Sequence, residues 1–233
     1  MRVSPLDLVF PPACVACGDV LHGMAFFCEP CELQVEPLPP ERCALCAEPG
    51  EFHAGVCPRC VARPPPFVET FAPFAHEGPV ARAIHRFKYE DHPELAAPLG
   101  SLLRQEASAF LRSGPRYVCA LPLHPSRRAD RKYDQAELLA GELCRKDADR
   151  KRLLLLDRVR QTSRQVGLSD VEREKNVRDA FRAREAARGL DVLLVDDVVT
   201  TGATARAAAQ ALLDAGAKSV RVLALARAFS ASS

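Results

Sequence analysis

The stretch of this sequence that most constrains its fold is an apolar run followed by two carboxylates and a threonine-rich turn. Residues 192–195 have the length and β-branching of a strand buried on both faces. Asp196 and Asp197 follow at the carboxyl end of this strand. The turn that leads into an alanine-rich helix consists of Thr200, Thr201, Gly202, Ala203 and Thr204. Ligands of open α/β sheets bind at the carboxyl ends of strands, so the stretch predicts a binding site.

The chemistry of this stretch predicts a ligand with both phosphate and hydroxyl groups. A helix amino terminus offers free backbone N–H groups, which bind phosphate. The carboxylates are repelled by phosphate and are expected to accept hydrogen bonds from hydroxyls or to hold a cation. A sugar phosphate satisfies both requirements. The alternatives are a buried strand with two acidic caps, or a Walker B strand, for which the chain lacks the partner G-x-x-x-x-G-K-[ST] loop.

Four C-x-x-C pairs at nearly equal spacing predict two structural zinc sites in residues 14–60. The cysteines are Cys14, Cys17, Cys28, Cys31, Cys43, Cys46, Cys57 and Cys60. Two thiolate pairs close one tetrahedral Cys₄ site around Zn²⁺. The equal spacing favours sequential pairing, first with second and third with fourth, and a cross-braced arrangement is the alternative. Disulfide or redox pairs are a weaker alternative, because cytoplasmic cysteines are kept reduced.

Charge divides the chain into two regions. Residues 1–62 contain three basic and eight acidic side chains, whereas the remainder contains 29 basic and 22 acidic ones. We therefore expect a double zinc ribbon domain over 1–62 and a second domain over 67–233, joined by the stiff Arg-Pro-Pro-Pro linker at 63–66. An acidic zinc domain repels phosphate backbones, so protein contacts are expected of it.

Neither a membrane span nor a signal peptide is expected. No apolar run approaches the roughly 18 residues that a transmembrane helix needs. Residues 1–12 lack a basic region followed by a continuous apolar one. We expect a cytoplasmic protein without membrane insertion.

Hydrophobic periodicity predicts alternating strands and helices after the linker. Expected strands are 69–75, 117–121, 153–156, 190–195 and 219–226, and expected helices are 79–89, 93–112, 134–143 and 202–216. In the first helix His85, Arg86 and Lys88 lie off the apolar face, where they either contact ligand or are solvated. Asp134 is the expected N-cap of the third helix. The alternation indicates an α/β fold with a doubly wound parallel sheet.

Basic side chains concentrate in residues 126–184, which hold 17 basic and 11 acidic groups. The loop with Arg127, Arg128, Arg131 and Lys132 follows a strand and could neutralise pyrophosphate, the alternative being a solvated charged loop. The polar segment 158–181 predicts a mobile lid with a short helix at 170–177. Cys119 and Cys144 are expected to be buried and inert.

The stretch 192–204 resembles the phosphoribosyl-pyrophosphate (PRPP) signature of type I phosphoribosyltransferases. The whole chain resembles the ComF/GntX family of competence-associated phosphoribosyltransferase-like proteins. The matching features are the C-x-x-C pairs, Pro-Leu-His-Pro at 122–125, Asp-Gln-Ala-Glu-Leu-Leu-Ala at 134–140, and the spaced set Arg160, Thr162, Gln165, Gly167, Leu168, Arg173, Asn176, Ala180 and Phe181. The resemblance implies a type I phosphoribosyltransferase-like sheet preceded by a small zinc-ribbon domain.

The resemblance also implies roles for individual residues. Asp196 and Asp197 would hold the ribose hydroxyls of PRPP, and residues 200–204 would cradle its 5′-phosphate. Arg128 would approach the pyrophosphate, and Mg²⁺ would bridge pyrophosphate and ribose. The lid would be lined by Arg160, Thr162, Gln165 and Arg173. No catalytic side chain is implied. The chain departs from the family at 132–135, where Lys-Tyr-Asp-Gln replaces the frequent Gly-Phe-Asn-Gln, which stiffens the turn and adds negative charge.

Three functions are compatible with these features. The first is a competence protein that handles single-stranded DNA in natural transformation through the basic 126–184 region and binds a helicase or recombination protein through its zinc domain. The second is an active enzyme that transfers ribose 5-phosphate from PRPP to a nitrogenous base. The third is a regulator that senses PRPP without turning it over. The sequence favours the first.

Overall fold

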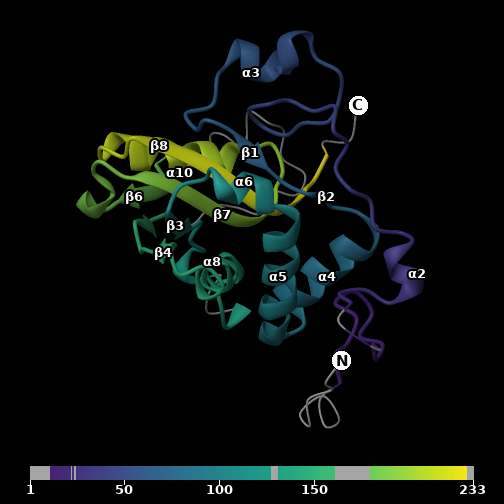
Figure 1. Ribbon diagram of the computed structural model, residues 1–233. Helices are drawn as coiled ribbons and strands as arrows, with labels where there is room; N and C mark the ends of the chain where they lie inside the picture. The colour runs from purple at the N-terminus through teal and green to yellow at the C-terminus, as the bar shows by residue number, and fades with distance from the viewer. Residues whose placement is uncertain (1–10, 22, 24, 127–130, 161–178, 230–233) are drawn as a thin grey trace.

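The core of the molecule is a parallel β-sheet with helices on both faces. A computed structural model describes residues 11–21, 23, 25–126, 131–160 and 179–229. The main sheet has the order β1-β8-β7-β3-β4, and β2 also pairs with β8, every pairing being parallel. Its strands are β1 (Thr70–Phe71), β2 (Phe74–Ala75), β3 (Tyr117–Ala120), β4 (Lys151–Arg152), β7 (Asp191–Val199) and β8 (Ser219–Arg227). Figure 1 shows the long central strands β7 and β8 side by side.

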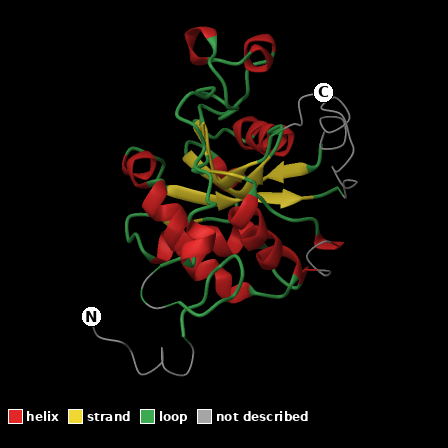
Figure 2. Ribbon diagram, turned by 90° about the vertical axis from the view of Figure 1, so that its right-hand side faces the viewer, coloured by secondary structure: helices red, strands yellow, loops and turns green. Residues whose placement is uncertain are grey.

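Alternate side chains of the two long strands enter different cores. Leu193 and Leu223 pack on one face with α4 (Gly78–Tyr89), α5 (Ala96–Glu106) and α8 (Gln135–Arg145). Leu194 and Val222 pack on the other face with α10 (Ala203–Asp214). Figure 2 shows the sheet between these helical layers. The remaining short elements are α2 (Glu29–Glu32), η1 (His53–Gly55), α3 (Pro58–Ala62), η2 (Pro93–Leu95), α6 (Ser108–Arg112) and η3 (Glu185–Ala187). The apolar runs of β7 and β8 thus supply both cores, and the doubly wound parallel fold is confirmed.

Most expected elements are present, but three of them differ substantially from their expected bounds. The strand expected at 69–75 is split into β1 and β2 around Ala72 and Pro73, because proline has no N–H for the ladder. The helix expected at 93–112 is divided into η2, α5 and α6. The signature strand continues to Val199 instead of ending at 195, so Asp196 and Asp197 lie within β7. Its pairing with β8 extends as far as Val199 opposite Arg227, which explains the extra length.

The prediction of a sheet strand at 153–156 is wrong. The edge strand of the sheet is β4, a polar and exposed pair of residues that no apolar run marks. The N–H of Leu153 still donates to the Val118 carbonyl of β3 at 2.8 Å. The chain then leaves the sheet and leads into β5 (Leu156–Arg158), which pairs antiparallel with β6 (Phe181–Ala183). The lid between these strands and its short helix fall largely on residues 161–178, outside the described residues.

The two cysteine-rich ribbons contact different parts of the sheet domain. The first, residues 11–35, packs beside α4, and the second, residues 41–62, lies near the end of β8 and α10. Figure 1 shows α2 next to α4 and α3 on the far side of the sheet from them. The segment 36–40, which connects the two ribbons, is hydrogen-bonded to the part of the chain that forms the sheet, since the Leu38 N–H donates to the Pro73 carbonyl at 2.7 Å. The division into 1–62 and 67–233 stays a prediction.

No helix among the described residues has the length and apolar character that crossing a lipid bilayer requires.

Candidate functional site

A cavity of about 260 Å³ lies at the carboxyl ends of β3 and β7. Its walls include Asp196 and Asp197 from β7 and Thr200, Gly202 and Thr204 from the turn before α10. The loop after β3 contributes the opposite wall, beginning at residue 121. The carboxyl ends of two neighbouring parallel strands are where open α/β sheets bind their ligands. The predicted carboxylates and turn are therefore brought together in one cavity.

The turn before α10 is shaped to present backbone amides to the cavity. Gly202 has φ +78°, in the left-handed region that favours glycine, and it directly precedes the helix. The Ala203 N–H donates to the Thr201 Oγ1 at 3.3 Å, which stabilises the turn. Thr201 is buried, and neither it nor Ala203 lines the cavity. The first amides of α10 have no partner within the helix, so this end suits an anion.

The two carboxylates differ in their surroundings. Asp197 is an ion-pair partner of Lys88, with 2.8 Å between Lys88 Nζ and Asp197 Oδ1. Asp196 accepts a hydrogen bond at 2.8 Å from the Asp197 N–H. Burial, followed by the neighbouring Asp197 charge, raises the pKa of Asp196 to about 8, although Lys88 opposes the shift. At neutral pH Asp196 is thus largely protonated and can donate as well as accept, while Asp197, paired with Lys88, offers acceptor oxygens to hydroxyls.

Asp134 connects the β3 loop to helix α8. Its Oδ1 accepts from the Glu137 N–H at 3.2 Å, and its Oδ2 accepts from the Leu123 N–H at 2.8 Å. The expected N-cap is therefore confirmed, and the same carboxylate fixes the loop wall of the cavity. Lys132, which occupies the position of the family's glycine, has φ +64°. It pairs with the exposed Asp91. A side chain is held here in a conformation that glycine adopts without strain.

The cavity wall also includes His76 and Gln135, for which the sequence predicted no role at the site, and Arg131 of the predicted basic loop. His76 lies on its wall, and burial, followed by the charge of Lys88, lowers the pKa of His76. Gln135 is 1% exposed and donates to the Phe87 carbonyl at 3.3 Å. Arg131 lines the cavity while donating to Tyr89 and Gln135. No local pattern marks His76, because it reaches the cavity through the pairing of β2 with β8.

Several predicted site residues are not brought into this cavity by the described structure. Arg128, Thr162, Gln165 and Arg173 lie outside the described residues. Arg160 is described and exposed, and it is not part of the cavity wall. From the helix expected at 79–89, Lys88 faces the carboxylates, whereas Arg86 faces the first ribbon and His85 is exposed.

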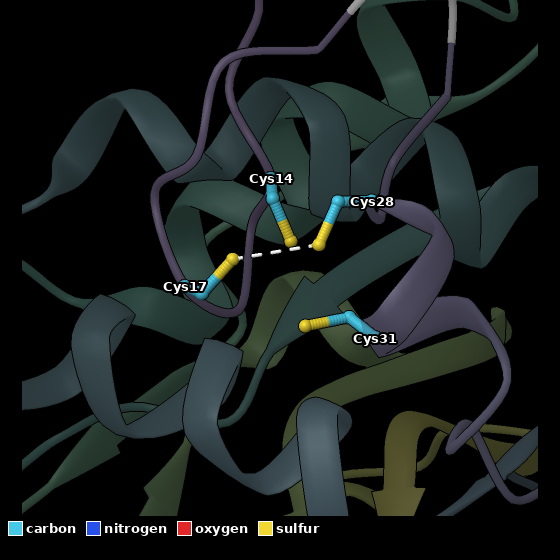
Figure 3. Close-up of side chains that lie close together, drawn as sticks. All are labelled: Cys14, Cys17, Cys28 and Cys31. Carbon is cyan, nitrogen blue, oxygen red and sulfur yellow. Dashed lines mark hydrogen bonds between the residues drawn. The ribbon is translucent and has the colours of Figure 1, made fainter.

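The eight predicted ligand cysteines form two clusters in which all sulfur atoms lie within 4.8 Å of one another. Cys14, Cys17, Cys28 and Cys31 form the first cluster, which Figure 3 shows converging on a common centre. Cys43, Cys46, Cys57 and Cys60 form the second. The structure thus has the sequential pairing, not the cross-braced one.

The sulfur geometry fits Zn²⁺. The Cys17 and Cys28 Sγ atoms are 3.6 Å apart, and the Cys46 and Cys57 Sγ atoms are 3.7 Å apart. Two thiolates about 2.3 Å from a tetrahedral ion lie about 3.8 Å from each other. Burial alone would raise the pKa of Cys14, but hydrogen bonds from backbone N–H groups lower it to about 6. The pKa values of the other three cysteines of this cluster are raised, so Cys14 is the member that most favours the thiolate. Two Cys₄ sites consistent with Zn²⁺ are therefore present.

Each thiolate cluster has an arginine from the sheet domain beside it. Arg82 of α4 donates to Cys31 Sγ at 3.6 Å, and Arg206 of α10 donates to Cys60 Sγ at 3.5 Å. A Cys₄ zinc site has a net charge of −2, so a guanidinium group stabilises it. Outside the clusters, Cys119 is buried and Cys144 is half-buried, and burial raises the pKa of both thiols, that of Cys119 to about 12.

Comparisons with known proteins match both halves of the chain. The double zinc ribbon domain model matches residues 5–61, and the phosphoribosyl transferase domain model matches residues 137–231. The DNA utilization protein YhgH of Salmonella typhimurium is 34% identical over 79% of this chain and 83% of its own length. Competence protein F of Haemophilus influenzae is 28% identical over 92% of this chain and 96% of its own. Competence protein ComFC of Bacillus subtilis is 25% identical over 81% and 78%. With this overall similarity and both domains in the same order, the chain belongs to the ComF family, which joins a double zinc ribbon to a type I phosphoribosyltransferase-like fold.

Proposed function

We propose that this protein is a cytoplasmic, ComF-like competence protein that handles single-stranded DNA in natural transformation and carries a PRPP-binding pocket. The printed names of its relatives, which refer to competence and to DNA utilization, support the DNA-handling part. The observation that carries the pocket is the cavity in which Asp196 and Asp197 face the turn before α10. A ribose phosphate is the ligand that would use both at once.

In the proposed complex the phosphate binds at the amino terminus of α10 and the ribose hydroxyls bind the carboxylates. The backbone amides after Gly202 supply the donors for the phosphate. Asp197, paired with Lys88, accepts from one hydroxyl, and the protonated Asp196 both donates and accepts. The loop from residue 121 approaches the pyrophosphate, with Arg128 in the adjoining segment.

The donor set suits a Mg²⁺ ion that arrives with the phosphates of the ligand. Asp197 is already paired with Lys88, and the pKa of Asp196 is raised, so neither carboxylate is a strong ligand for a bare ion. Mg²⁺ keeps most of its coordination to phosphate oxygens and water in such sites. When bound, the ion would offset the charge of the pyrophosphate.

The DNA would follow the basic region 126–184, and the acidic ribbons would bind a helicase or recombination protein. Within the described part of that region, Arg184 pairs with Asp157 at 2.7 Å and Arg131 donates to Tyr89 at 2.9 Å. The loop at 127–132 has four basic side chains and one acidic side chain, so it carries much of the charge proposed for DNA contacts. Phosphate neutralisation makes such binding strongly dependent on salt.

Charge reversal of this loop tests the DNA assignment. The variant replaces Arg127, Arg128, Arg131 and Lys132 with Glu. A matched control reverses Arg112, Arg116, Lys146 and Lys218, four exposed cations at the opposite ends of the strands. Binding of oligo-dT is measured by fluorescence anisotropy between about 50 and 200 mM salt. We expect the loop variant to bind oligo-dT more weakly and with a smaller dependence on salt. The control variant is expected to stay closer to wild type in both respects. Equal binding by wild type and loop variant removes this loop as the DNA surface.

An active phosphoribosyltransferase is the second candidate, because the cavity would position PRPP and the phosphoribosyl transferase model covers residues 137–231. The test is release of pyrophosphate from PRPP and Mg²⁺ with each nitrogenous base in turn. Release that depends on one base and is lost in Asp197→Ala favours the enzyme. PRPP binding without release for any base favours the third candidate, a PRPP-sensing regulator.

A further inference from the structure

Lys88 lines the cavity, although it comes from a helix that precedes the signature strand by about a hundred residues of sequence. It occupies the last turn of α4, next to the fully buried Phe87. Its Nζ is 2.8 Å from Asp197 Oδ1, and the two side chains are only 16% and 11% exposed. An ion pair this well shielded from water is not a flexible surface contact.

The two adjacent carboxylates create an electrostatic problem for a phosphate ligand. Negative charge on one of these carboxylates disfavours charge on the other, and negative charge on the pair repels an incoming phosphate. Among the described residues of the cavity wall, Arg131 donates to Tyr89 and Gln135, and Arg158 lies 5.2 Å from the Phe181 ring centre. Lys88 contacts Asp197 directly, and its positive charge also acts on Asp196. It therefore offsets their charge before any ligand arrives.

We propose that Lys88 is the internal counter-ion of the ribose site: it positions Asp197 for the ribose hydroxyls and lets them bind without a metal ion at the carboxylates. This inference rests on the proposed ribose phosphate pocket. A divalent cation on the same carboxylate oxygen would lie next to the ammonium group, and the two positive charges would repel each other. A metal that accompanies PRPP then binds its phosphates, and the hydroxyl contacts do not require it.

The position of Lys88 is set by the first zinc ribbon through helix α4. Arg86, two residues before Lys88, donates from Nη1 to the Cys14 carbonyl at 3.1 Å and to the Val15 carbonyl at 3.0 Å. Its side chain is 18% exposed. One turn earlier, Arg82 donates to Cys31 Sγ. The ribbon thus fixes the end of α4 from which Lys88 reaches the cavity.

Ribose 5-phosphate is the appropriate probe, because it has the hydroxyls and the 5′-phosphate but no pyrophosphate to carry a metal. The full chain is titrated with ribose 5-phosphate with and without added MgCl₂. For wild type we expect affinities that differ by less than about threefold between the two conditions. For Lys88→Met we expect a loss of about tenfold or more without Mg²⁺, the usual scale of a hydrogen bond to a charged group, and partial recovery with Mg²⁺.

Two further variants separate a positioning role from a structural one. His85→Ala, on an exposed position of the same helix, is the matched control and is expected to bind like wild type. Lys88→Met combined with Asp197→Asn removes both charges, and its weaker binding is expected to be independent of Mg²⁺. This double variant also provides the test if Lys88→Met alone does not fold. A merely structural role would lower the melting temperature and leave the ratio of affinities with and without Mg²⁺ unchanged.

The proposal is overturned if Lys88→Met binds ribose 5-phosphate as wild type does without Mg²⁺, or if the double variant depends on Mg²⁺ as strongly as the single one. A wild-type protein that binds neither ribose 5-phosphate nor PRPP overturns the pocket itself, and this inference with it. The two failures are therefore distinguishable.

Discussion

The two zinc ribbons have the same ligand pattern but are attached to the sheet domain by different forces. The first contributes Val15, Leu21 and Phe27 to the same apolar core as α4 and α5. The second forms a small cluster of its own around its four cysteines. It is held by charge: Glu48 pairs with both Arg59 and the buried Arg227 at the end of β8.

This difference teaches that one local motif can be either part of a core or an appended module. The first ribbon shares apolar surface with the helix that carries Lys88, so its folding is tied to the cavity. The second is tied through arginines of β8 and α10, while its apolar contacts remain mostly internal. We expect the loss of each metal to have distinct consequences.

The largest expected effect comes from removing one ligand of each site. Cys31→Ala is expected to lower the stability of the whole chain by several kcal/mol, because losing the metal unfolds the ribbon and exposes side chains such as Val15 and Phe27, each worth about 1.5–3 kcal/mol. Cys60→Ala is expected to unfold the second ribbon with a smaller effect on the sheet domain. Thermal unfolding by circular dichroism and zinc content, near one ion per chain in each variant, provide the measurement. Equal losses of stability in both variants would contradict the proposed difference between the two ribbons.

A second variant tests the ion pair between Glu48 and Arg227, which holds the second ribbon against β8. Glu48→Gln leaves Arg227, which is 1% exposed, without its carboxylate partner, and removing one member of a buried pair costs about 3–5 kcal/mol. The matched control is Glu142→Gln, which breaks the pair with the more exposed Arg145 and is expected to cost less than about 1 kcal/mol. Urea unfolding of the two variants compares them. If the two losses are alike, charge does not hold this ribbon.

A third effect concerns the cavity, where titration of Asp196 is expected to change the stability of the folded chain. The pKa of Asp196 in the folded chain is raised to about 8, so its protonated form is favoured by folding. Its contribution to stability is complete below about pH 4, the usual pKa of an unfolded aspartate, and is lost as the pH rises toward 8. Asp196→Asn is expected to lack this loss and to be more stable than wild type at pH 8, by on the order of a few kcal/mol. Urea unfolding between pH 5 and 8 measures it, and parallel stability profiles of the two proteins would contradict it.

The smallest expected effect compares the same turn position in the two ribbons. Gly18, after the first C-x-x-C pair, has φ +86°, and Ala47, after the third pair, has φ +57°. Gly18→Ala is expected to destabilise by about 1–2 kcal/mol. Ala47→Gly is expected to be within about 1 kcal/mol of neutral, because the relief of strain is offset by loss of a buried methyl group that packs with Leu38 and Ala72. Urea unfolding measures both variants. A Gly18→Ala variant as stable as wild type, or an Ala47→Gly variant that is clearly less stable than Gly18→Ala, would contradict this prediction.

Local patterns made the metal sites and the parallel sheet predictable. The C-x-x-C spacing is set within a few residues of chain, and the apolar run at 192–195 identifies a central strand wherever the rest of the chain lies. The end of that strand was misjudged because aspartates are uncommon in strands. Here pairing with β8 continues past them to Val199.

Long-range packing decided what the sequence left open. Lys88 reaches Asp197 only because α4 packs on the face of the sheet next to β7, and His76 reaches the cavity only through the pairing of β2 with β8. The edge strand β4 was missed because its two residues are polar and exposed. The different attachment of the two ribbons is likewise absent from the spacing of their cysteines, which is nearly identical.

The most direct test of the central claim, a ribose phosphate site between the β7 carboxylates and α10, is calorimetric titration of the full chain with PRPP and Mg²⁺. Wild type and the variant with Asp196→Ala and Asp197→Ala are compared after both have been checked for folding and zinc content. The account predicts saturable binding to wild type with one site per chain and its loss in the variant. No binding to wild type, or equal binding to both proteins, would contradict it.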